Sequence, residues 1–321
     1  MAAHPLISVI IPNWNGAVHL PTCLSSLRAQ TYPNFEVILV DNASTDESLD
    51  LVYNYYPEVR VVPLPENRGL TGGVNAGFLA AKGDILVALN NDTETDPHWL
   101  EEIERALAEH PEAGMAASKM LLFDRRNTLH SAGDGYGIDG IPINRGVWEV
   151  DKGQFDGDTY CFGACGGAAA YRRAMIDEVG LFDESLFMYL EDVDLAWRGQ
   201  LAGYRCVFAP KAIVYHKLSA TGGGPIASFY VGRNTLYVLF KDVPSPILRR
   251  YWGQMARAQW RIFIEALRAW RGEAARARLR GQIAGLLLLP RALQARPKVQ
   301  ATRRVSVDYV DAILTRPVSR T

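Results

Sequence analysis

The chain has 321 residues, of which 48% are hydrophobic and 21% are charged. These values are ordinary for a globular protein and exclude a disordered or fibrous chain. The net charge of −1 is unevenly spread, since residues 241–321 contain 17 Lys and Arg against 5 Asp and Glu and leave 17 basic and 30 acidic residues to the remainder. An acidic body with a basic tail predicts two regions with different partners.

The four cysteines have no spacing that suggests a disulfide framework or a zinc site, so we expect them to be reduced and packed. They are Cys23, Cys161, Cys165 and Cys206. No apolar run approaches the ~18 residues that a membrane-spanning helix needs, and we recognise no signal peptide. We therefore expect a cytoplasmic protein, and peripheral contact with the inner face of the cell membrane stays an open alternative.

The first third of the chain alternates between buried strands and helices. Apolar runs at 6–11, 35–40, 59–63 and 85–89 indicate strands, and helical patterns or capping residues separate them. This alternation predicts an α/β protein with a doubly wound, mostly parallel sheet. Neither G-x-G-x-x-G after the first strand nor G-x-x-x-x-G-K-[ST] occurs, which argues against a dinucleotide-binding dehydrogenase and a P-loop protein.

The fourth strand, 85–89, ends in Asn90, Asn91 and Asp92, and the second strand ends in Asp41. Because ligands of open α/β sheets bind at the carboxyl ends of the strands, these side chains would meet at one edge. A carboxylate beside amide oxygens suits a hard divalent cation that carries phosphates. Asp41 could accept a hydrogen bond from a base or a ribose. Turns also explain Asn and Asp at strand ends, so both interpretations stay open.

Residues 123–160 form a polar, glycine-rich segment that we expect to be a long loop facing the substrate, with a plain surface insertion as the alternative. The segment 163–168 then fits a G-x-nucleophile-x-G turn with Cys165 as the nucleophile and His216 as the downstream candidate for its base. A close approach of the backbone to a ligand or a strand explains these small residues better than a cysteine hydrolase does.

A helix that ends at Gly203 is predicted to begin with the acidic residues Glu191, Asp192 and Asp194. Acidic groups are favoured near a helix N-terminus, but three within four residues repel one another, so stability alone does not require them. A site that removes a proton from a hydroxyl group does require a placed carboxylate. Asp194 and Arg198 are spaced to pair on one face of the helix.

Taken together, these stretches resemble the inverting, nucleotide-sugar-dependent glycosyltransferases of family 2, which have the GT-A fold. The nearest resemblance is to the bacterial rhamnosyltransferase-like branch, and it covers about residues 6–216. The matching motifs are Val9-Ile10-Ile11-Pro12-Asn13-Trp14-Asn15, Val40-Asp41-Asn42-Ala43-Ser44-Thr45-Asp46, Asn67-Arg68-Gly69, Asn90-Asn91-Asp92 and Glu191-Asp192-Val193-Asp194-Leu195 with Arg198. Each motif is weakly specific alone, and their order along the chain carries the resemblance.

The resemblance implies a role for each matching position. Asp192 would be the catalytic base beside Glu191, and Asp92 would hold Mg²⁺ or Mn²⁺ together with His216. The residues expected to bind the nucleotide-sugar are Pro12, Asn13, Asn15, Asp41, Arg68, Asn75, Asn91 and Asp92. The further residues expected to face the substrate are Gly166, Gly167, Asp194 and Arg198.

One position departs from the family pattern, because Asn90 stands where the D-x-D motif has its first Asp. The resemblance still implies a bound metal, since Asn is tolerated here in this branch. It implies transfer of a sugar, with rhamnose as the first guess, from a dTDP- or UDP-sugar donor to a hydroxyl group. The acceptor would be a glycan or a polyprenyl-linked glycan in cell-surface polysaccharide synthesis. The alternative is a non-catalytic nucleotide-sugar-binding partner in a membrane-associated glycan assembly.

We divide the chain into a GT-A catalytic domain, residues 1–217, and a C-terminal basic helical appendage, residues 218–321. The apolar residues of the appendage that fall near one helical stripe are Trp252, Met255, Trp260, Ile264 and Leu267. Basic amphipathic helices with Trp can lie on anionic membranes or pack on the catalytic domain, and both remain open. No nucleic-acid-binding motif accompanies the charge, so we expect no nucleic-acid partner. Oligomerisation stays open.

Overall fold

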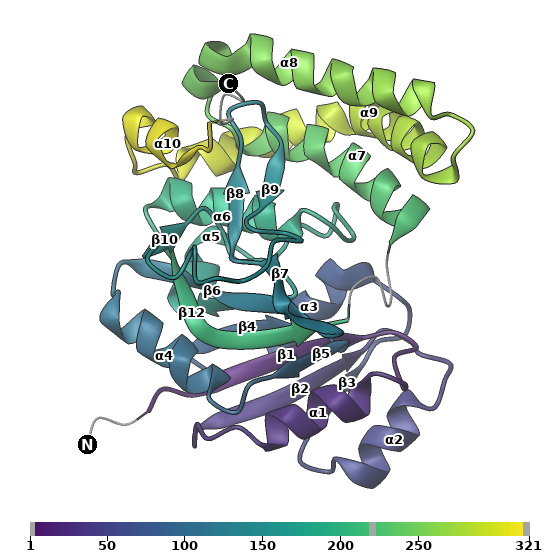
Figure 1. Ribbon diagram of the computed structural model, residues 1–321, viewed down its shortest axis with the longest axis vertical. Coiled ribbons are helices and arrows are strands. Elements are labelled where there is room, and N and C mark those ends of the chain that lie inside the picture. Colours follow the sequence, from purple (N-terminus) through teal and green to yellow (C-terminus); the bar gives the residue numbers. More distant parts are fainter. Residues whose placement is uncertain (1–3, 218–222, 317–321) are drawn as a thin grey trace.

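The computed structural model describes residues 4–217 and 223–316. Figure 1 shows a central β-sheet in the lower part of the molecule, with helices on both of its faces. The C-terminal helices gather at the opposite end. The predicted α/β architecture with a helical C-terminal region is therefore confirmed.

The first seven elements alternate between strand and helix, as predicted. They are β1 (Ile7–Asn13), α1 (Leu20–Arg28), β2 (Phe35–Asp41), α2 (Ser48–Tyr55), β3 (Arg60–Pro63), α3 (Gly69–Ala80) and β4 (Ile85–Leu89). β1 lies between β2 and β4 and runs parallel to both, and β3 is parallel to β2. All residues of β1 and β4 are buried, which explains why these strands are nearly continuous apolar runs.

The second half of the sheet is mixed. Its elements are β5 (Thr93–Thr95), α4 (Trp99–Glu109), β6 (Ala113–Leu122), β11 (Ala168–Arg172), α5 (Arg173–Val179), α6 (Glu191–Ala202) and β12 (Arg205–His216). β11 runs antiparallel to β4 and β6, whereas β12 is parallel to β6. β12 is one continuous strand of 12 residues. Its pairing with β6 is interrupted between Ala209 and Ile213, where Pro210 lacks an N–H donor.

The prediction that residues 123–160 form a structureless loop is wrong. The segment contains β7 (Arg125–Ser131), β8 (Asp134–Tyr136) and β9 (Pro142–Asn144), and β10 (Tyr160–Cys161) begins at its end. Residues 128–138 are all buried. The polar residues of this segment show no strand pattern in the sequence, because the elements that bury them come from distant parts of the chain. The main sheet has the order β10-β12-β6-β11-β4-β1-β2-β3, with β7 paired to β6 and β5 paired to β12.

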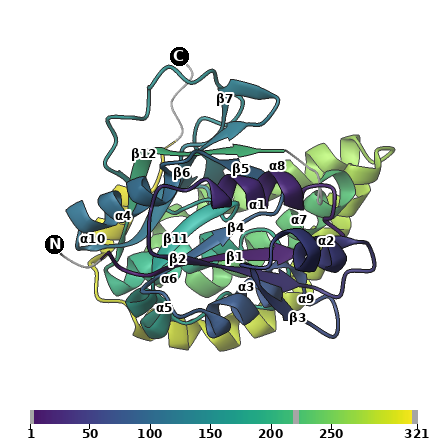
Figure 2. The ribbon, with the colours of Figure 1, turned by 90° about the horizontal axis from the view of Figure 1, so that it is seen from below.

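Each face of the sheet carries an apolar core. Ile7, Val9 and Ile11 of β1 belong to the cluster that includes buried residues of α1 and α4. Ile10 points to the opposite face, whose cluster includes residues of α3, α6 and the C-terminal helices. This alternation follows from the two-residue period of a strand. Figure 2 views the molecule from below, with α1 and α2 on the near side of the sheet.

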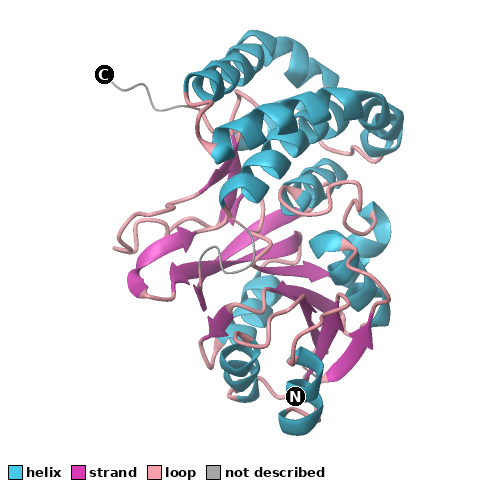
Figure 3. Cartoon of the chain, turned by 90° about the vertical axis from the view of Figure 1, so that its right-hand side faces the viewer, coloured by secondary structure: helices cyan, strands magenta, loops and turns pink. Residues whose placement is uncertain are grey.

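Among residues 223–316, four helices follow the sheet, and their bounds are α7 (Gly224–Asp242), α8 (Ser245–Arg268), α9 (Glu273–Ala301) and α10 (Val307–Ile313). The backbones of α7 and α9 approach closely, since a Cβ on Gly281 would lie 2.2 Å from the Phe229 carbonyl oxygen. Tyr237 of α7 and Met255 of α8 share a core cluster with Ile10 of the sheet. Figure 3 shows these helices as a layer above the strands. The division between residues 217 and 218 stays a prediction.

The apolar stripe predicted for α8 needs one correction, because Met255 is buried in the core whereas Trp252 and Trp260 are exposed. Trp252, Trp260 and Leu267 are spaced by eight and seven residues, about two turns each, so they lie on one exposed side of the helix. Within residues 4–217 and 223–316, no helix is both long and apolar enough to cross a membrane.

Candidate active site

The carboxyl ends of β1, β2 and β4 lie at one edge of the sheet and bring three predicted residues together. Asn13, Asp41 and Asn91 are all buried. Asn91 Nδ2 donates to Asn13 Oδ1 over 2.7 Å, and Asn13 Nδ2 donates to Asp41 Oδ1 over 3.4 Å. The Asp41 carboxylate also accepts the main-chain N–H of Ser44 over 3.1 Å. This network fixes Asp41 at the edge where ligands of such sheets bind.

Pro12 is buried in β1, and further contacts fix the loop after this strand, where exposed Asn15 lies. Asn15, with a φ of 51°, accepts the main-chain N–H of Thr45 at Oδ1 over 2.7 Å. Gly16 is required in this loop, because a Cβ there would lie 2.1 Å from Asn91 Nδ2. The structure therefore brings the predicted residues after β1, β2 and β4 to one place.

Two other residues expected at the nucleotide have protein partners. Arg68, at the start of α3, pairs with Glu184 over 2.7 Å on an exposed rim, so a donor diphosphate would have to displace that carboxylate. Asn75 is buried, and its amide bonds Phe182 twice, donating to the carbonyl oxygen over 2.9 Å and accepting the N–H over 3.0 Å. This placement corrects the prediction for Asn75, which ties α3 to the segment before α6.

Asp92 and His216, the predicted metal ligands, lie side by side. Asp92 Oδ1 is 3.1 Å from His216 Nε2, yet the two atoms are not aligned as a hydrogen bond. Asn90 Nδ2 lies 3.5 Å from the same Nε2. Asp92 is 3% exposed, and a buried carboxylate oxygen without a hydrogen bond is costly unless a cation binds it. A carboxylate and an imidazole are a donor set that fits a divalent cation.

A second imidazole, His130 of β7, lies against His216 and was not predicted. The two ring centroids are 4.7 Å apart, and the ring planes are tilted by 33°. Burial and the neighbouring His216 lower the pKa of His130 to about 3, although Asp92 acts in the opposite direction, so the imidazole is neutral. No motif marks His130, because it reaches the site only through the pairing of β7 with β6.

Asp192, the predicted base, occupies the first turn of α6. Its Oδ2 accepts the main-chain N–H of Gly166 over 2.8 Å, and its Oδ1 accepts the N–H of Val193 over 2.8 Å. Burial raises the pKa of Asp192, and the hydrogen bonds from Gly166 and Val193 offset this only in part. The raised pKa makes the carboxylate a stronger base.

Gly166 and Gly167 connect the end of β4, where the metal ligand is predicted, to Asp192. The Gly167 carbonyl oxygen accepts the N–H of Asn90 over 3.0 Å, and Gly166 donates to Asp192. A Cβ on Gly166 would lie 3.2 Å from both Asp192 Oδ2 and Glu191 Oε1. The small residues therefore allow the close backbone approach that the sequence predicts.

Glu191 is buried beside Asp192, and its Oε2 has no hydrogen-bonding partner among the described residues. Burial and the charges of Asp192 and Asp194 raise the pKa of Glu191 well above its ordinary range. This environment favours the neutral form of Glu191, so it leaves Asp192 as the better candidate for the base.

Asp194 and Arg198 pair over 2.7 Å as predicted, but they do not face the substrate. Asp194 is fully buried and also binds Lys241 of α7. Arg198 donates to the main-chain oxygens of residues 179–181. Burial raises the pKa of Asp194, but the charges of Lys241 and Arg198 outweigh it and lower the pKa below the ordinary value. The prediction for these two residues is corrected, since they anchor α6 to its neighbours.

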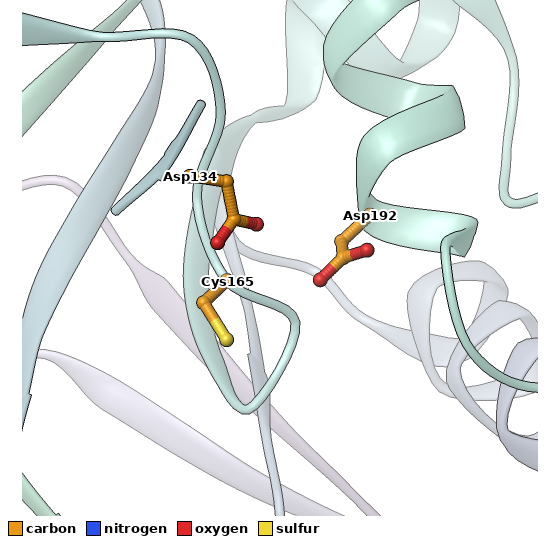
Figure 4. Close-up of side chains that lie close together, drawn as sticks. All are labelled: Asp134, Cys165 and Asp192. Atoms are coloured by element: carbon orange, nitrogen blue, oxygen red, sulfur yellow. The ribbon is translucent and has the colours of Figure 1, made fainter. Parts of the chain in front are cut away.

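Asp134 of β8 and Cys165 lie beside Asp192, as Figure 4 shows, with one ligand atom of each residue within 4.8 Å of the others. Burial and the Asp192 charge raise the pKa of Asp134 well above its ordinary range. Burial and the two neighbouring carboxylates also raise the pKa of the Cys165 thiol. A thiol that stays protonated is a poor nucleophile, so the structure gives no support to a cysteine hydrolase.

The segment 187–190, just before the acidic start of α6, has a strained backbone that α7 holds. Its residues with a φ of 65° are Phe187, Tyr189 and Leu190. Such left-handed conformations cost non-glycine residues about 1–3 kcal/mol each. Asn234 Nδ2 lies 2.7–3.1 Å from three main-chain oxygens of residues 186–189. Arg233 also binds the Leu186 oxygen and adds a bond to the Ser185 oxygen, and local sequence patterns could not reveal either contact.

The mixed sheet, with carboxylates at its edge, is the arrangement expected of a GT-A-type glycosyltransferase. The family model described as glycosyl transferase family 2 matches residues 8–180. The chain belongs to glycosyl transferase family 2 and is a glycosyltransferase, which confirms the predicted family.

Two curated relatives show which branch the chain resembles. It is 27% identical over 261 residues to the N-acetylglucosaminyl-diphospho-decaprenol L-rhamnosyltransferase of Mycobacterium tuberculosis. This alignment covers 74% of this chain and 84% of the relative. It is 30% identical over 228 residues to the O-antigen biosynthesis protein RfbC of Myxococcus xanthus. This alignment covers 68% of this chain and 18% of that protein. The predicted resemblance to rhamnosyltransferases is therefore confirmed.

Two solved structures have the same fold. The mannosyltransferase PcManGT from Pyrobaculum calidifontis, in complex with GDP-Man and Mn²⁺, aligns with a TM-score of 0.56 and 20% identity over 97% of this chain and 79% of that chain. S. aureus TarS 1-349 in complex with UDP-GlcNAc aligns with a TM-score of 0.59 and 20% identity over 92% of this chain and 83% of that chain. At this identity the likeness shows the GT-A fold alone.

Proposed function

We propose that the protein transfers a sugar from a nucleotide-diphosphate donor to a hydroxyl group of a glycan or lipid-linked glycan, with inversion at the anomeric carbon, in cell-surface polysaccharide synthesis. One observation carries the proposal: main-chain hydrogen bonds connect Asn90, two residues before Asp92, through Gly167 and Gly166 to Asp192. A cation ligand and a base are thereby held in fixed relation at one edge of the sheet.

The donor would bind at the strand ends. Asp92 and His216 would hold Mg²⁺ or Mn²⁺, and this ion supplies Lewis-acid neutralisation of the departing diphosphate. Asp41, held by Asn13, would accept the ring N–H that uracil and thymine both present. The first donors to test are therefore UDP- and dTDP-sugars, and dTDP-rhamnose is the specific proposal because of the rhamnosyltransferase relative.

Asp192 would act on the acceptor. Its carboxylate takes the proton of the acceptor hydroxyl while that oxygen forms its bond to the anomeric carbon. The bond from this carbon to the phosphate oxygen breaks, and its electron pair leaves with the diphosphate. A single displacement of this kind inverts the anomeric configuration. The Gly166 N–H keeps the Asp192 carboxylate in place throughout.

The proposed lipid-linked acceptor is supported by the M. tuberculosis relative, whose name specifies N-acetylglucosaminyl-diphospho-decaprenol, and by the surface of α8. Trp252 and Trp260 are 53% and 64% exposed on one side of this helix. Exposed arginines recur at seven-, four- and seven-residue intervals along another side, and they are Arg250, Arg257, Arg261 and Arg268. Aromatic residues beside positive charge suit an anionic lipid surface, so we include peripheral membrane contact in the proposal.

A second candidate is a non-catalytic nucleotide-sugar-binding partner in a membrane-associated assembly. Asn90 favours it, because the amide leaves Asp92 as the one carboxylate of the triplet. This candidate predicts nucleotide binding without any turnover of the donor.

Titration calorimetry of the full chain with dTDP, UDP and GDP, each with and without Mn²⁺, tests the donor site. Metal-dependent binding of one nucleotide supports the proposal, and no binding under either condition contradicts it. Transfer or donor hydrolysis that is lost in Asp192→Asn, while nucleotide affinity is kept, separates the enzyme from the binding partner. Asp177→Asn, on the exposed side of α5, is the matched control.

A further inference from the structure

We propose that Asp134, Cys165 and Asp192 form a binding site for Zn²⁺, and that the bound ion inhibits transfer because it occupies the proposed base. One ligand atom from each residue lies within 4.8 Å of the other two (Figure 4). The site differs in chemistry from the predicted Mg²⁺ or Mn²⁺ site at Asp92 and His216, because a sulfur ligand selects softer cations. Only the inhibition rests on the proposed function, since the binding of zinc does not require it.

Main-chain contacts on both sides of Cys165 hold the three ligands together. Two residues before Cys165, the Gly163 carbonyl oxygen accepts the N–H of Asp134 over 2.8 Å. One residue after Cys165, Gly166 donates its N–H to Asp192 Oδ2 over 2.8 Å. The ligands come from β8, from the turn before β11 and from the start of α6, and the backbone fixes their relative positions before any ion binds.

A buried oxygen without a partner points to a ligand at this place. Asp134 is 3% exposed, and its Oδ1 has no hydrogen-bonding partner in the described part of the chain. Figure 4 shows its carboxylate turned toward that of Asp192. Arg145, whose main chain bonds the residue before Asp134, directs its guanidinium to Asp158 instead. A buried carboxylate without a cation or a hydrogen bond is costly, and a bound Zn²⁺ would satisfy it.

The donor set matches the coordination chemistry of zinc. Zn²⁺ binds thiolate sulfur at about 2.3 Å and carboxylate oxygen at about 2.0–2.2 Å, so the ligand atoms of a tetrahedral ion lie roughly 3.5 Å apart. Side-chain rotations bring atoms that already lie within 4.8 Å to this separation. Cys165 and Asp192 are half-buried, so the ion can enter from their side. The Cys165 thiol gives its proton to the solvent when it binds the ion.

The bound ion would act on the proposed base. Three protein ligands leave the fourth position of a tetrahedral zinc to water. A positive charge in contact with a carboxylate favours its ionised form, so Asp192 on the ion would be a much weaker base for the acceptor hydroxyl. Occupancy by Zn²⁺ should therefore slow transfer.

A proton alone could also satisfy Asp134, and this alternative makes a different prediction. A protonated Asp134 that serves only as a packed, neutral group takes no part in metal binding, so Asp134→Asn would leave the metal affinity unchanged. The amide keeps the shape of the side chain and is not among the usual zinc ligands. This variant therefore distinguishes a ligand from a buried neutral group.

The experiment titrates Co²⁺, as a spectroscopic substitute for Zn²⁺, into the full chain with excess Mg²⁺ present to occupy the Asp92 site. A thiolate ligand gives Co²⁺ a charge-transfer band in the near ultraviolet, and displacement of Co²⁺ by Zn²⁺ measures the zinc affinity. We expect the band in the wild type and its loss in Cys165→Ser. The metal affinity should be about 10-fold or more lower in Asp134→Asn.

Cys161→Ser is the matched control and should keep the band. The Cys161 sulfur lies 3.5 Å from that of Cys206, so this pair of thiols is another place where a soft cation could bind. Thermal unfolding without metal checks the folding of each variant, and Cys165→Ala gives the same test should the serine variant fail to fold. A wild type without the band, or a band that Cys165→Ser keeps, overturns the site.

The inhibition is measured separately, with the rate of each variant compared to its own rate without zinc. The Zn²⁺ concentration that halves transfer should be about 10-fold or more higher in Cys165→Ser than in the wild type. Equal inhibition of the two proteins overturns the inhibitory role. A chain that gives the expected Co²⁺ spectra but no transfer contradicts the proposed function and supports the zinc site.

Discussion

Gly166 donates its main-chain N–H to Oδ2 of Asp192 over 2.8 Å, so a backbone group holds the proposed base. The next residue, Gly167, accepts the N–H of Asn90 at the end of β4. Donors that are already in place need little reorganisation when charge shifts during a reaction. Main-chain contacts of two glycines therefore set the distance between the proposed cation ligands and the proposed base.

Replacing Gly166 with Ala should lower kcat by roughly 10-fold, because the new Cβ would lie 3.2 Å from oxygens of both Asp192 and Glu191 and would shift them slightly. Nucleotide affinity should stay at the wild-type level, since the donor site lies at the strand ends. Steady-state kinetics and calorimetry on the same preparation measure both. Gly157→Ala is the control, because no atom lies within 4 Å of its added Cβ. Wild-type kcat in Gly166→Ala would show that the base has room to move.

The rate should depend on the ionisation of Asp192. Burial raises the pKa of this carboxyl above its ordinary value of 3.8, and the base works only when deprotonated. As the pH falls through the raised pKa, the carboxylate gains a proton, and kcat/KM should fall tenfold per pH unit below it. The midpoint should lie above 3.8. A profile of kcat/KM across the acidic range measures it, with circular dichroism as the check on folding, and a midpoint at or below 3.8 contradicts the assignment.

Asp92→Ala should weaken donor binding about 10-fold or more in the presence of Mn²⁺ and leave the metal-free affinity unchanged, because the carboxylate acts through the ion. Asn90→Asp offers the matched opposite change, since it adds a second carboxylate near His216 and should strengthen Mn²⁺ binding. Calorimetry of both variants with and without Mn²⁺ gives the four affinities. An equal loss in Asp92→Ala under both conditions would make Asp92 a structural residue.

The sequence predicted those parts of the molecule whose signals are local. β1 and β4 are apolar because helices cover both faces of the sheet, and the acidic start of α6 follows from the residues of its first turn. The spacing of Asp194 and Arg198 predicted their ion pair but not that the pair is buried against α7. Lys241, which binds Asp194 in the interior, lies 47 positions away along the chain.

The residues that sequence reasoning missed reach the site through long-range contacts. His130 is placed by the pairing of β7 with β6, and Asp134 is placed by a bridge between its strand and Gly163. Asn234 contacts the segment before α6 from a helix of the C-terminal region. A polar residue in such a segment belongs to no periodic pattern that would indicate a functional contact. Only the folded structure shows which residues it contacts.

Asn234→Ala should lower the free energy of unfolding by about 2 kcal/mol or more, because it leaves main-chain oxygens of residues 186–189 without their buried donor. It should also lower kcat, since the strained segment 187–190 positions the start of α6. Urea unfolding and steady-state kinetics measure the two effects. Gln294→Ala, an exposed amide on α9, is the control and should change neither. An Asn234→Ala enzyme with wild-type stability would refute the role of this contact.

The exposed side of α8 should bind anionic lipid. Replacing Trp252 and Trp260 together with Ser should reduce co-sedimentation with phosphatidylglycerol vesicles, because it removes the aromatic groups that would enter the interface. Replacing Arg257 and Arg261 together with Gln should cost about 1 kcal/mol per charge, and this loss should shrink as salt screens the wild-type attraction. Phosphatidylcholine vesicles should bind weakly in every case. Trp148→Ser, which removes a tryptophan that is 58% exposed in the segment 123–160, is the matched control. Wild-type sedimentation of the Trp252 and Trp260 double variant would show that α8 does not form the membrane contact.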